Sequence, residues 1–259
     1  MNILSVDFIL TAFLIFVRVS SLLMTAPFFS GAMIPVRIKL FFSIALTVML
    51  YPIIPLQGAA IATDAHVVQI FIAVLKEVMV GVAMGLVGQI IVSGIQFGGQ
   101  IISFTTSLGF ANIVDPVNRH QSALISQFML LLGLLFFLAI DGDKIYIKAL
   151  TQSFEIVPVG TVHAAHAAPV FVDMSIYLFK IGVQLASPFI VVLFLLDLSF
   201  AIFARIMPQA NIFFIALPVK VGVGILLMLL VIPYLPTTFQ QIFDHLWKYL
   251  SILLYAIGP

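Results

Sequence analysis

The sequence predicts an all-α, membrane-associated protein whose hydrophobic helices kink at prolines. Hydrophobic residues form 63% of the 259 residues and charged residues only 8%, against roughly 25% charged residues in an ordinary soluble domain. The mean hydropathy is +1.27. Asp, Glu, Lys and Arg are absent from four long stretches, residues 40–63, 78–114, 120–140 and 221–243.

No water-soluble core could bury all of these stretches, so we expect a bilayer or a large apolar assembly around them. A spanning helix needs ~20 apolar residues to cross ~30 Å of hydrocarbon. A chain of 259 residues has room for six such spans with short connections. We expect one compact membrane unit, residues 1–259, as a single domain.

Composition also excludes several classes of protein. Eleven basic and ten acidic residues give a net charge of +1, and there is no basic run, so nucleic acid is not an expected partner. The chain has no cysteine, which excludes disulfides and thiolate chemistry. No positive charge precedes the apolar run in residues 1–17, and we therefore expect a retained first helix rather than a cleaved signal.

The N-terminal third contains three expected helical elements. The first covers about residues 3–26, and a turn follows between Pro27 and Pro35. The second covers about 40–51 and ends at Pro52, because proline cannot continue a helix. The third begins near Val67 and enters a stretch whose glycines, at positions 81, 85 and 88, leave one helix face bare for close packing.

A polar stripe follows along the same helix. Unpaired amide and hydroxyl groups are costly in hydrocarbon, so these side chains should face protein or water. They form either a hydrogen-bonded seam between helices or one wall of an aqueous passage. The stripe consists of Gln89, Ser93, Gln96, Gln100, Ser103 and Ser107, at intervals of three and four residues.

Residues 108–121 break the helical pattern with Gly109 and the pair Asp115 and Pro116, yet they include the apolar residues Phe110 and Ile113. The sequence therefore predicts a loop that carries its own hydrophobic side chains. A clean span follows at about 122–140.

The C-terminal half contains two further long elements. Asp141, Lys144 and Lys148 are spaced to share one helical face. An element from about 170 to 204 contains Pro188, which should kink it unless neighbours satisfy the freed carbonyl. The last span covers about 221–239, and a tail with Trp247 resembles an interfacial anchor.

No catalytic or cofactor motif is present. Phosphate-binding, nucleophile-elbow and zinc-protease patterns are all missing, and no catalytic residue or cofactor is predicted. His163 and His166 lie close together but without a carboxylate or third ligand, so no metal is predicted. Charges inside apolar stretches are ion relays or gating charges, or else they pair with partner subunits or lie at interfaces; they are Arg18, Lys76, Glu77, Asp173, Lys180, Asp197 and Arg205.

Four ordered blocks resemble one known family. The segment RIMPQANIFFIALPVK, residues 205–220, is similar to the RxxPQxNxFxxxLPxK signature of the R subunit of the flagellar and type III secretion export gate, called FliR. Similar blocks are PFFSGAMIPVRIKL from Pro27, FGGQIISFTTSLGFANIVDP ending at Pro116, and DGDKIYIKALTQSFEIVPVG at 141–160. One departure is Asp143, where most relatives are expected to have histidine.

The resemblance implies a core subunit of a hetero-oligomeric helical gate in the bacterial inner membrane, within the flagellar basal body. P-type and Q-type subunits, an FlhB-like switch subunit and the larger export apparatus are the implied partners, and unfolded flagellar proteins are the implied substrates. Membrane lipid also surrounds such a gate. Helices of this family form tilted hairpins, so the six-span count can fail.

The resemblance also implies roles for particular residues. The family's loop after the polar helix projects into the pore, which corresponds here to Gly109, Phe110, Ile113, Asp115 and Pro116. For the signature residues we favour a structural role in a bend or a subunit contact over contact with substrate; they are Arg205, Pro208, Gln209, Asn211, Pro218 and Lys220.

Two other classes of protein compete with this interpretation. A small ion-coupled carrier would use Asp173, Lys180 and Asp197 with helices broken at Pro188 and Pro208. The lack of an evident internal repeat argues against it. A membrane enzyme would need a convergent acid, base and nucleophile, which the sequence does not offer.

Overall fold

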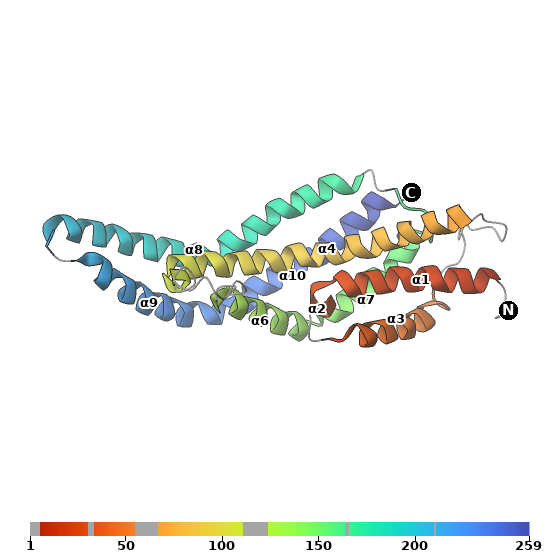
Figure 1. Cartoon of the computed structure of the whole chain (residues 1–259), viewed down its shortest axis with the longest axis horizontal. Helices are drawn as coiled ribbons and strands as arrows, with labels where there is room; N and C mark the ends of the chain where they lie inside the picture. Colours follow the sequence, from red (N-terminus) through yellow and green to blue (C-terminus); the bar gives the residue numbers. More distant parts are fainter. Residues whose placement is uncertain are drawn as a thin grey trace. The chain divides into compact units, whose positions relative to one another are not determined.

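The computed structural model describes residues 6–30, 34–54, 67–110, 124–163, 166–209 and 211–258 (Figure 1). Every regular element in these ranges is helical, which confirms the all-α prediction. The elements are α1 (Val6–Thr25), α2 (Pro27–Ser30), α3 (Val36–Leu50), α4 (Val67–Thr105), η1 (Leu108–Phe110), α6 (Leu124–Ala139), α7 (Gly142–Ile156), α8 (Ala167–Ile206), α9 (Ile212–Val231), η3 (Ile232–Tyr234) and α10 (Leu235–Ile257).

Four helical stretches in the described ranges are long and apolar enough to cross a membrane, or five if the broken pair α6 and α7 counts as one span. The count is below the six that chain length allowed. The second expected span is α3, whose 15 residues would extend only about 22 Å at ~1.5 Å per residue, short of the ~30 Å of hydrocarbon.

The last expected span was wrong in its extent. Helix α9 ends at Val231, a 3-10 turn containing Pro233 follows, and residues 235–257 form α10 rather than a tail. Proline at the start of the 3-10 turn prevents the ladder of backbone hydrogen bonds from continuing unchanged. The amphipathic pattern of α10, unlike the uniform apolar pattern of α9, is typical of a helix that covers a core.

Pro188 lies inside the continuous helix α8. Proline has no N–H, so the carbonyl of Gln184, four residues earlier, loses its helical partner. The Ser187 hydroxyl donates to that carbonyl at 2.9 Å. The neighbouring side chain thus satisfies the freed acceptor, and α8 continues for 40 residues.

The chain divides into two compact units. The first comprises Met1–Ile90, Asp141–Ser175 and Phe243–Pro259, and the second comprises Ile91–Ile140 and Ile176–Ile242. That the whole chain forms one subunit domain stays a prediction, since two packing units can unfold together or separately.

In the first unit, α1 packs closely on α4 at Gly81 and Gly85. A β-carbon at Gly81 would lie 2.5 Å from the Arg18 carbonyl oxygen, and one at Gly85 would lie 2.6 Å from the β-carbon of Thr25. These distances leave no room for a side chain. The predicted role of the bare glycine face in helix packing is confirmed.

Helix α3, also in the first unit, has its polar side turned inward. Lys39, Ser43 and Thr47 are buried where α3 packs on α1, while Phe41 and Val48 are exposed. The Ser43 and Thr47 hydroxyls donate to backbone carbonyls four residues earlier, both at 2.7 Å. Ser43 and Thr47 are therefore buried and hydrogen-bonded, and the exposed face of α3 carries apolar side chains such as Phe41 and Val48.

Candidate functional site

The described part of the chain covers the predicted polar stripe of α4 only in part. Ser103 is buried, Ser93, Gln96 and Ser107 are half-buried, and Gln89 and Gln100 are exposed. The Ser126 hydroxyl of α6 donates to the Gln96 backbone carbonyl at 2.9 Å, which leaves the Gln96 side chain out of that contact. Both interpretations of the stripe, a hydrogen-bonded seam and one wall of an aqueous passage, stay predictions.

The predicted plug segment begins where α4 ends. Ser107 has a positive φ of 62°, and the chain turns into η1. Gly109 lies against the end of α4, since a β-carbon there would be 3.3 Å from the Ser103 carbonyl oxygen. Ile113, Asp115 and Pro116 lie outside the described residues, as does the side chain of Phe110.

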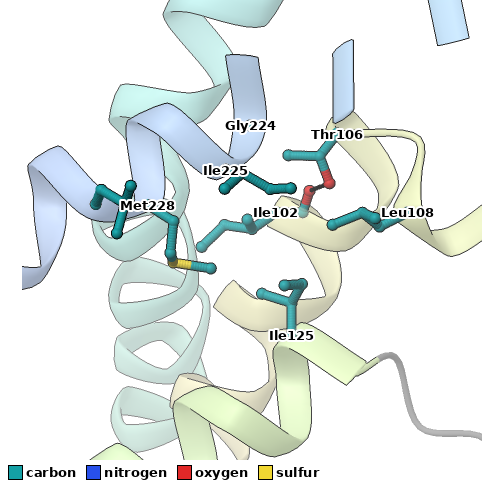
Figure 2. Close-up of a pocket in the computed structure, with 8 residues that line it drawn as sticks. Ile102, Thr106, Leu108, Ile125, Gly224, Ile225 and Met228 are labelled. Atoms are coloured by element: carbon teal, nitrogen blue, oxygen red, sulfur yellow. Dashed lines mark hydrogen bonds between the residues drawn. The ribbon is translucent and has the colours of Figure 1, made fainter. Parts of the chain in front are cut away.

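Residues on either side of the plug segment, 109–119, line one apolar hollow of about 120 Å³ in the second unit (Figure 2). Leu108 precedes the segment, Ile125 follows it, and α9 supplies the opposite side. The lining residues are Ile102, Thr106, Leu108, Ile125, Gly224, Ile225, Met228 and Leu229. The Thr106 hydroxyl donates to the Ile102 carbonyl at 2.8 Å, so it presents no unsatisfied donor to the hollow.

Close approach of α9 to α4 depends on Gly224. A β-carbon at Gly224 would lie 2.5 Å from Cγ2 of Thr106. Gly224 is the one buried residue of α9. The base of the plug segment is therefore held to α9 by a contact that any larger residue would disturb.

A buried ion pair lies at the centre of the first unit. Arg18 of α1 and Glu77 of α4 are both fully buried, and Nε of Arg18 donates to Oε2 of Glu77 at 2.6 Å while Nη2 donates to Oε1 at 3.1 Å. The guanidinium also donates to the carbonyls of Ser153 and Val157 at 2.9 and 3.0 Å. Its face lies 4.3 Å from the Phe154 ring centre.

The same network holds the chain after α7. The Gly160 backbone N–H donates to Glu77 at 2.8 Å, and Lys76 Nζ donates to the Gly160 carbonyl at 2.9 Å. Gly160 has a φ of +84°, a left-handed conformation that glycine adopts without steric cost. Two of the charges noted in the sequence, Arg18 and Glu77, are therefore each other's partners within the chain. They lie 59 residues apart.

The signature residues extend from Arg205 in the last turn of α8, through the turn at 207–211, into α9 of the second unit (Figure 1). Pro208 and Gln209 lie in this turn, Asn211 precedes α9, and Pro218 lies inside it. Lys220 Nζ forms an ion pair with Asp197 of α8 at 2.5 Å. From 191 to 209 and from 211 to 220, Leu193 is the single buried residue. We name residues 191–220 the outer hairpin.

The acidic and basic residues of a carrier do not converge in the described ranges. Asp197 is paired with Lys220, and Asp173 and Lys180 lie two turns apart on exposed positions of α8. Among the residues that the structure describes, no three His, Asp or Glu side chains come together as metal ligands. The backbone N–H of His163 donates to the Ile257 carbonyl at 3.0 Å, which ties its loop to α10.

Comparison with known proteins decides the family. Residues 9–246 match the family described as bacterial export proteins, family 1. The chain is 31% identical over 245 residues to the flagellar biosynthetic protein FliR of Aquifex aeolicus, covering 94% of this chain and 93% of the relative. This chain belongs to the FliR family.

Other FliR proteins agree over most of their length. The FliR of Caulobacter vibrioides is 33% identical, with 85% of this chain and 87% of the relative covered. The FliR of Escherichia coli is 29% identical, with 90% and 88% covered. All four blocks that suggested the FliR family lie within the matched range.

Membership assigns the chain to the flagellar export apparatus as a membrane protein. A FliR protein is a component of protein transport rather than an enzyme. Partners within the export apparatus follow in general terms from the same membership.

Proposed function

We propose that this chain is the R-type core subunit of the type III protein export gate. With P-type and Q-type subunits it forms the pore through which unfolded flagellar substrates cross the bacterial inner membrane, within the flagellar basal body. The observation that carries the proposal is the FliR match over residues 9–246.

The distribution of exposed apolar side chains supports an assembled rather than a solitary protein. The outer hairpin exposes Phe214 at 71% and Ile206 at 68% while also carrying the ion pair of Asp197 and Lys220. Exposure of large apolar side chains is unfavourable in water, and an ion pair is unfavourable in hydrocarbon. Neighbouring subunits of a gate accommodate both.

Gating at residues 109–119 is part of the proposal. Apolar side chains of this segment exclude water and ions at rest, and the segment moves aside when substrate arrives under the proton motive force. The apolar hollow beside Leu108 supports this role, because it gives the residue that leads into the segment an apolar surface against α9. The polar stripe of α4 then forms a seam or a pore wall.

Co-expression with the P-type and Q-type subunits tests the assembly. We expect the three chains to purify as one stable complex in detergent. A stable, monodisperse, solitary chain under the same conditions would reject the gate and return the carrier as the better account.

Conductance of the assembled gate tests the plug. Replacement of residues 110–113 by Ser should increase ion leak at rest, while the same number of Ser replacements on the exposed face of α3, at Phe41, Ile44, Val48 and Met49, serves as a control. An unchanged leak in the plug variant rejects hydrophobic gating.

Gln209→Leu should reduce complex yield before it changes leak, and a normal complex with lost export would contradict the assembly role.

A further inference from the structure

Ser107, at the C-terminal end of α4, has a backbone conformation that serine rarely adopts. Its φ is 62°, in the left-handed region, where the β-carbon of an L-residue lies too close to the following carbonyl oxygen. Helices commonly end at a residue in this conformation, but that residue is usually glycine, because glycine has no β-carbon. The end of α4 therefore carries backbone strain.

Comparison with a second residue shows that Ser107 is the unusual one. Among the described residues, Asp141 is the only other non-glycine residue with a positive φ, at 59°, directly before α7. Aspartate and asparagine are several-fold enriched in the left-handed region, because their short polar side chains bond to nearby backbone. Serine has no such preference, and the Ser107 hydroxyl forms no hydrogen bond within the described residues. Its own side chain thus does not offset the strain.

Contacts on both sides of Ser107 hold this conformation. Before it, Thr106 is tied into α4, since its backbone N–H and its hydroxyl donate to the Ile102 carbonyl at 3.0 and 2.8 Å. After it, Leu108 lines the apolar hollow against α9 (Figure 2), and Gly109 lies against the end of α4. Strained residues persist where their surroundings over-determine them, and they cluster in switch regions.

Leu108 is the contact that can be withdrawn. Thr106 is fixed by hydrogen bonds, whereas Leu108 is only half-buried and lies beside apolar residues such as Ile225 and Met228. Ile225 is itself 54% exposed, so the hollow is open on one side. Once Leu108 leaves the hollow, Ser107 loses the contact that opposes its return to a negative φ. That return changes the direction in which the chain leaves α4.

We propose that Ser107 is a strained pivot at the base of the plug segment, and that Leu108 in the apolar hollow locks it. With Leu108 seated, the left-handed turn directs residues 109–119 as the resting gate requires. With Leu108 withdrawn, Ser107 relaxes to a negative φ and the segment is redirected. The pivot rests on the proposed function, since it assumes that residues 109–119 close the pore. Strain released at Ser107 lowers the work of opening.

Two substitutions change the cost of the left-handed conformation in opposite directions. Ser107→Asn lowers the cost, and Ser107→Val raises it, because a β-branched residue is a strong outlier there. Resting ion conductance per assembled gate should increase roughly threefold or more in the Val variant, while the Asn variant should leak no more than the unchanged gate. Equal leak in the two variants overturns the proposal.

Leu108→Ala provides a background in which the pivot is tested without the Val variant. Removal of the seated side chain should itself increase resting leak. Adding Ser107→Asn should then reduce that leak roughly threefold, because it restores the preference for the resting φ. An Asn substitution that leaves the leak of Leu108→Ala unchanged also overturns the proposal.

The same substitution at Asp141 controls for strain in general. Asp141→Val places a β-branched residue at the other positive φ, outside the plug segment and the hollow. It should lower the thermal unfolding temperature of the complex without raising resting leak per assembled gate. An increase as large as that of Ser107→Val would attribute the leak to general destabilisation and overturn the pivot.

Failure of this inference differs from failure of the proposed function. If replacement of residues 110–113 by Ser leaves the leak unchanged, the gating function itself is wrong. If that replacement increases the leak but the Val and Asn variants of Ser107 leak equally, the pivot alone is wrong.

Discussion

The interior of the first unit and the outer hairpin of the second differ in whether charged and apolar side chains are buried or exposed. The first unit buries Arg18 and Glu77 completely and satisfies them with its own backbone. The outer hairpin buries only Leu193 among its described residues and leaves Asp197 half-exposed beside large apolar side chains. The first unit supplies its own partners for these charges, whereas the proposed gate covers the outer hairpin with neighbouring subunits, so substitutions in the two regions should differ in which property they change.

The largest effect on stability should come from Glu77→Leu. It leaves the Arg18 guanidinium buried without its carboxylate, which typically costs about 3–5 kcal/mol, and it removes the acceptor of the Gly160 N–H. Thermal unfolding of the detergent-solubilised complex and the chain's level in membranes measure the loss. Arg18→Met combined with Glu77→Leu should recover part of it. A single variant as stable as the unchanged protein would remove the contrast between the two regions.

The next largest effect should come from Gly85→Ala. The added methyl group would meet Thr25 at 2.6 Å, and forcing α1 away from α4 should cost about 1–3 kcal/mol. Gly222→Ala is the matched control, because nothing lies within 4 Å of a β-carbon there. The control should instead gain about 0.5–1 kcal/mol from helix propensity. The same thermal unfolding assay compares the two, and equal effects would show that α1 and α4 do not need the bare face.

A smaller effect is expected from Asp197→Asn. Its ion pair with Lys220 is partly exposed, with the two side chains 51% and 19% accessible, and such pairs contribute about 0–1 kcal/mol. A double-mutant cycle with Lys220→Gln measures the coupling. Coupling as large as that of Arg18 with Glu77 would mean that the hairpin is desolvated in the state measured.

The smallest effect on the chain's own stability should come from Phe214→Ser. Phe214 is 71% exposed, and surface substitutions usually change stability by less than about 0.5 kcal/mol. Co-purification with the other gate subunits should nevertheless fall, since the proposed gate places neighbouring subunits over this surface. Thermal unfolding of the complex that does assemble and the pull-down yield of that complex are measured side by side. A large loss of stability in the Phe214→Ser variant together with a normal yield of complex would contradict this prediction.

The sequence predicts the long helices well because charge-free apolar stretches of this length have few other stable forms. It fails at α10, where an amphipathic pattern after Pro233 resembles a tail when its core partners are unknown. The packing of Gly81 and Gly85 was foreseeable from spacing alone, since it requires only that some helix approach that face.

The charged contacts of the first unit could not be derived from one sequence. Arg18 and Glu77 are 59 residues apart and Arg18 and Val157 are 139 apart, and no local periodicity links such positions. The one available signal was the presence of Arg18 in one apolar stretch and of the adjacent Lys76 and Glu77 in another. The bond from Ser187 to Gln184, by contrast, spans three residues next to a proline, so its chemistry is local enough to read directly.

The long separation between Arg18 and its acceptors also sets an order of events during synthesis. At ~5–20 residues per second, Glu77 is added some 3–12 s after Arg18, and Val157 comes later still. Until then the nascent first helix carries a cation whose counter-charge does not yet exist. Until α4 is synthesised, the Arg18 side chain must therefore be held by the insertion machinery or hydrated at the bilayer surface, and only then can α1 pack on α4.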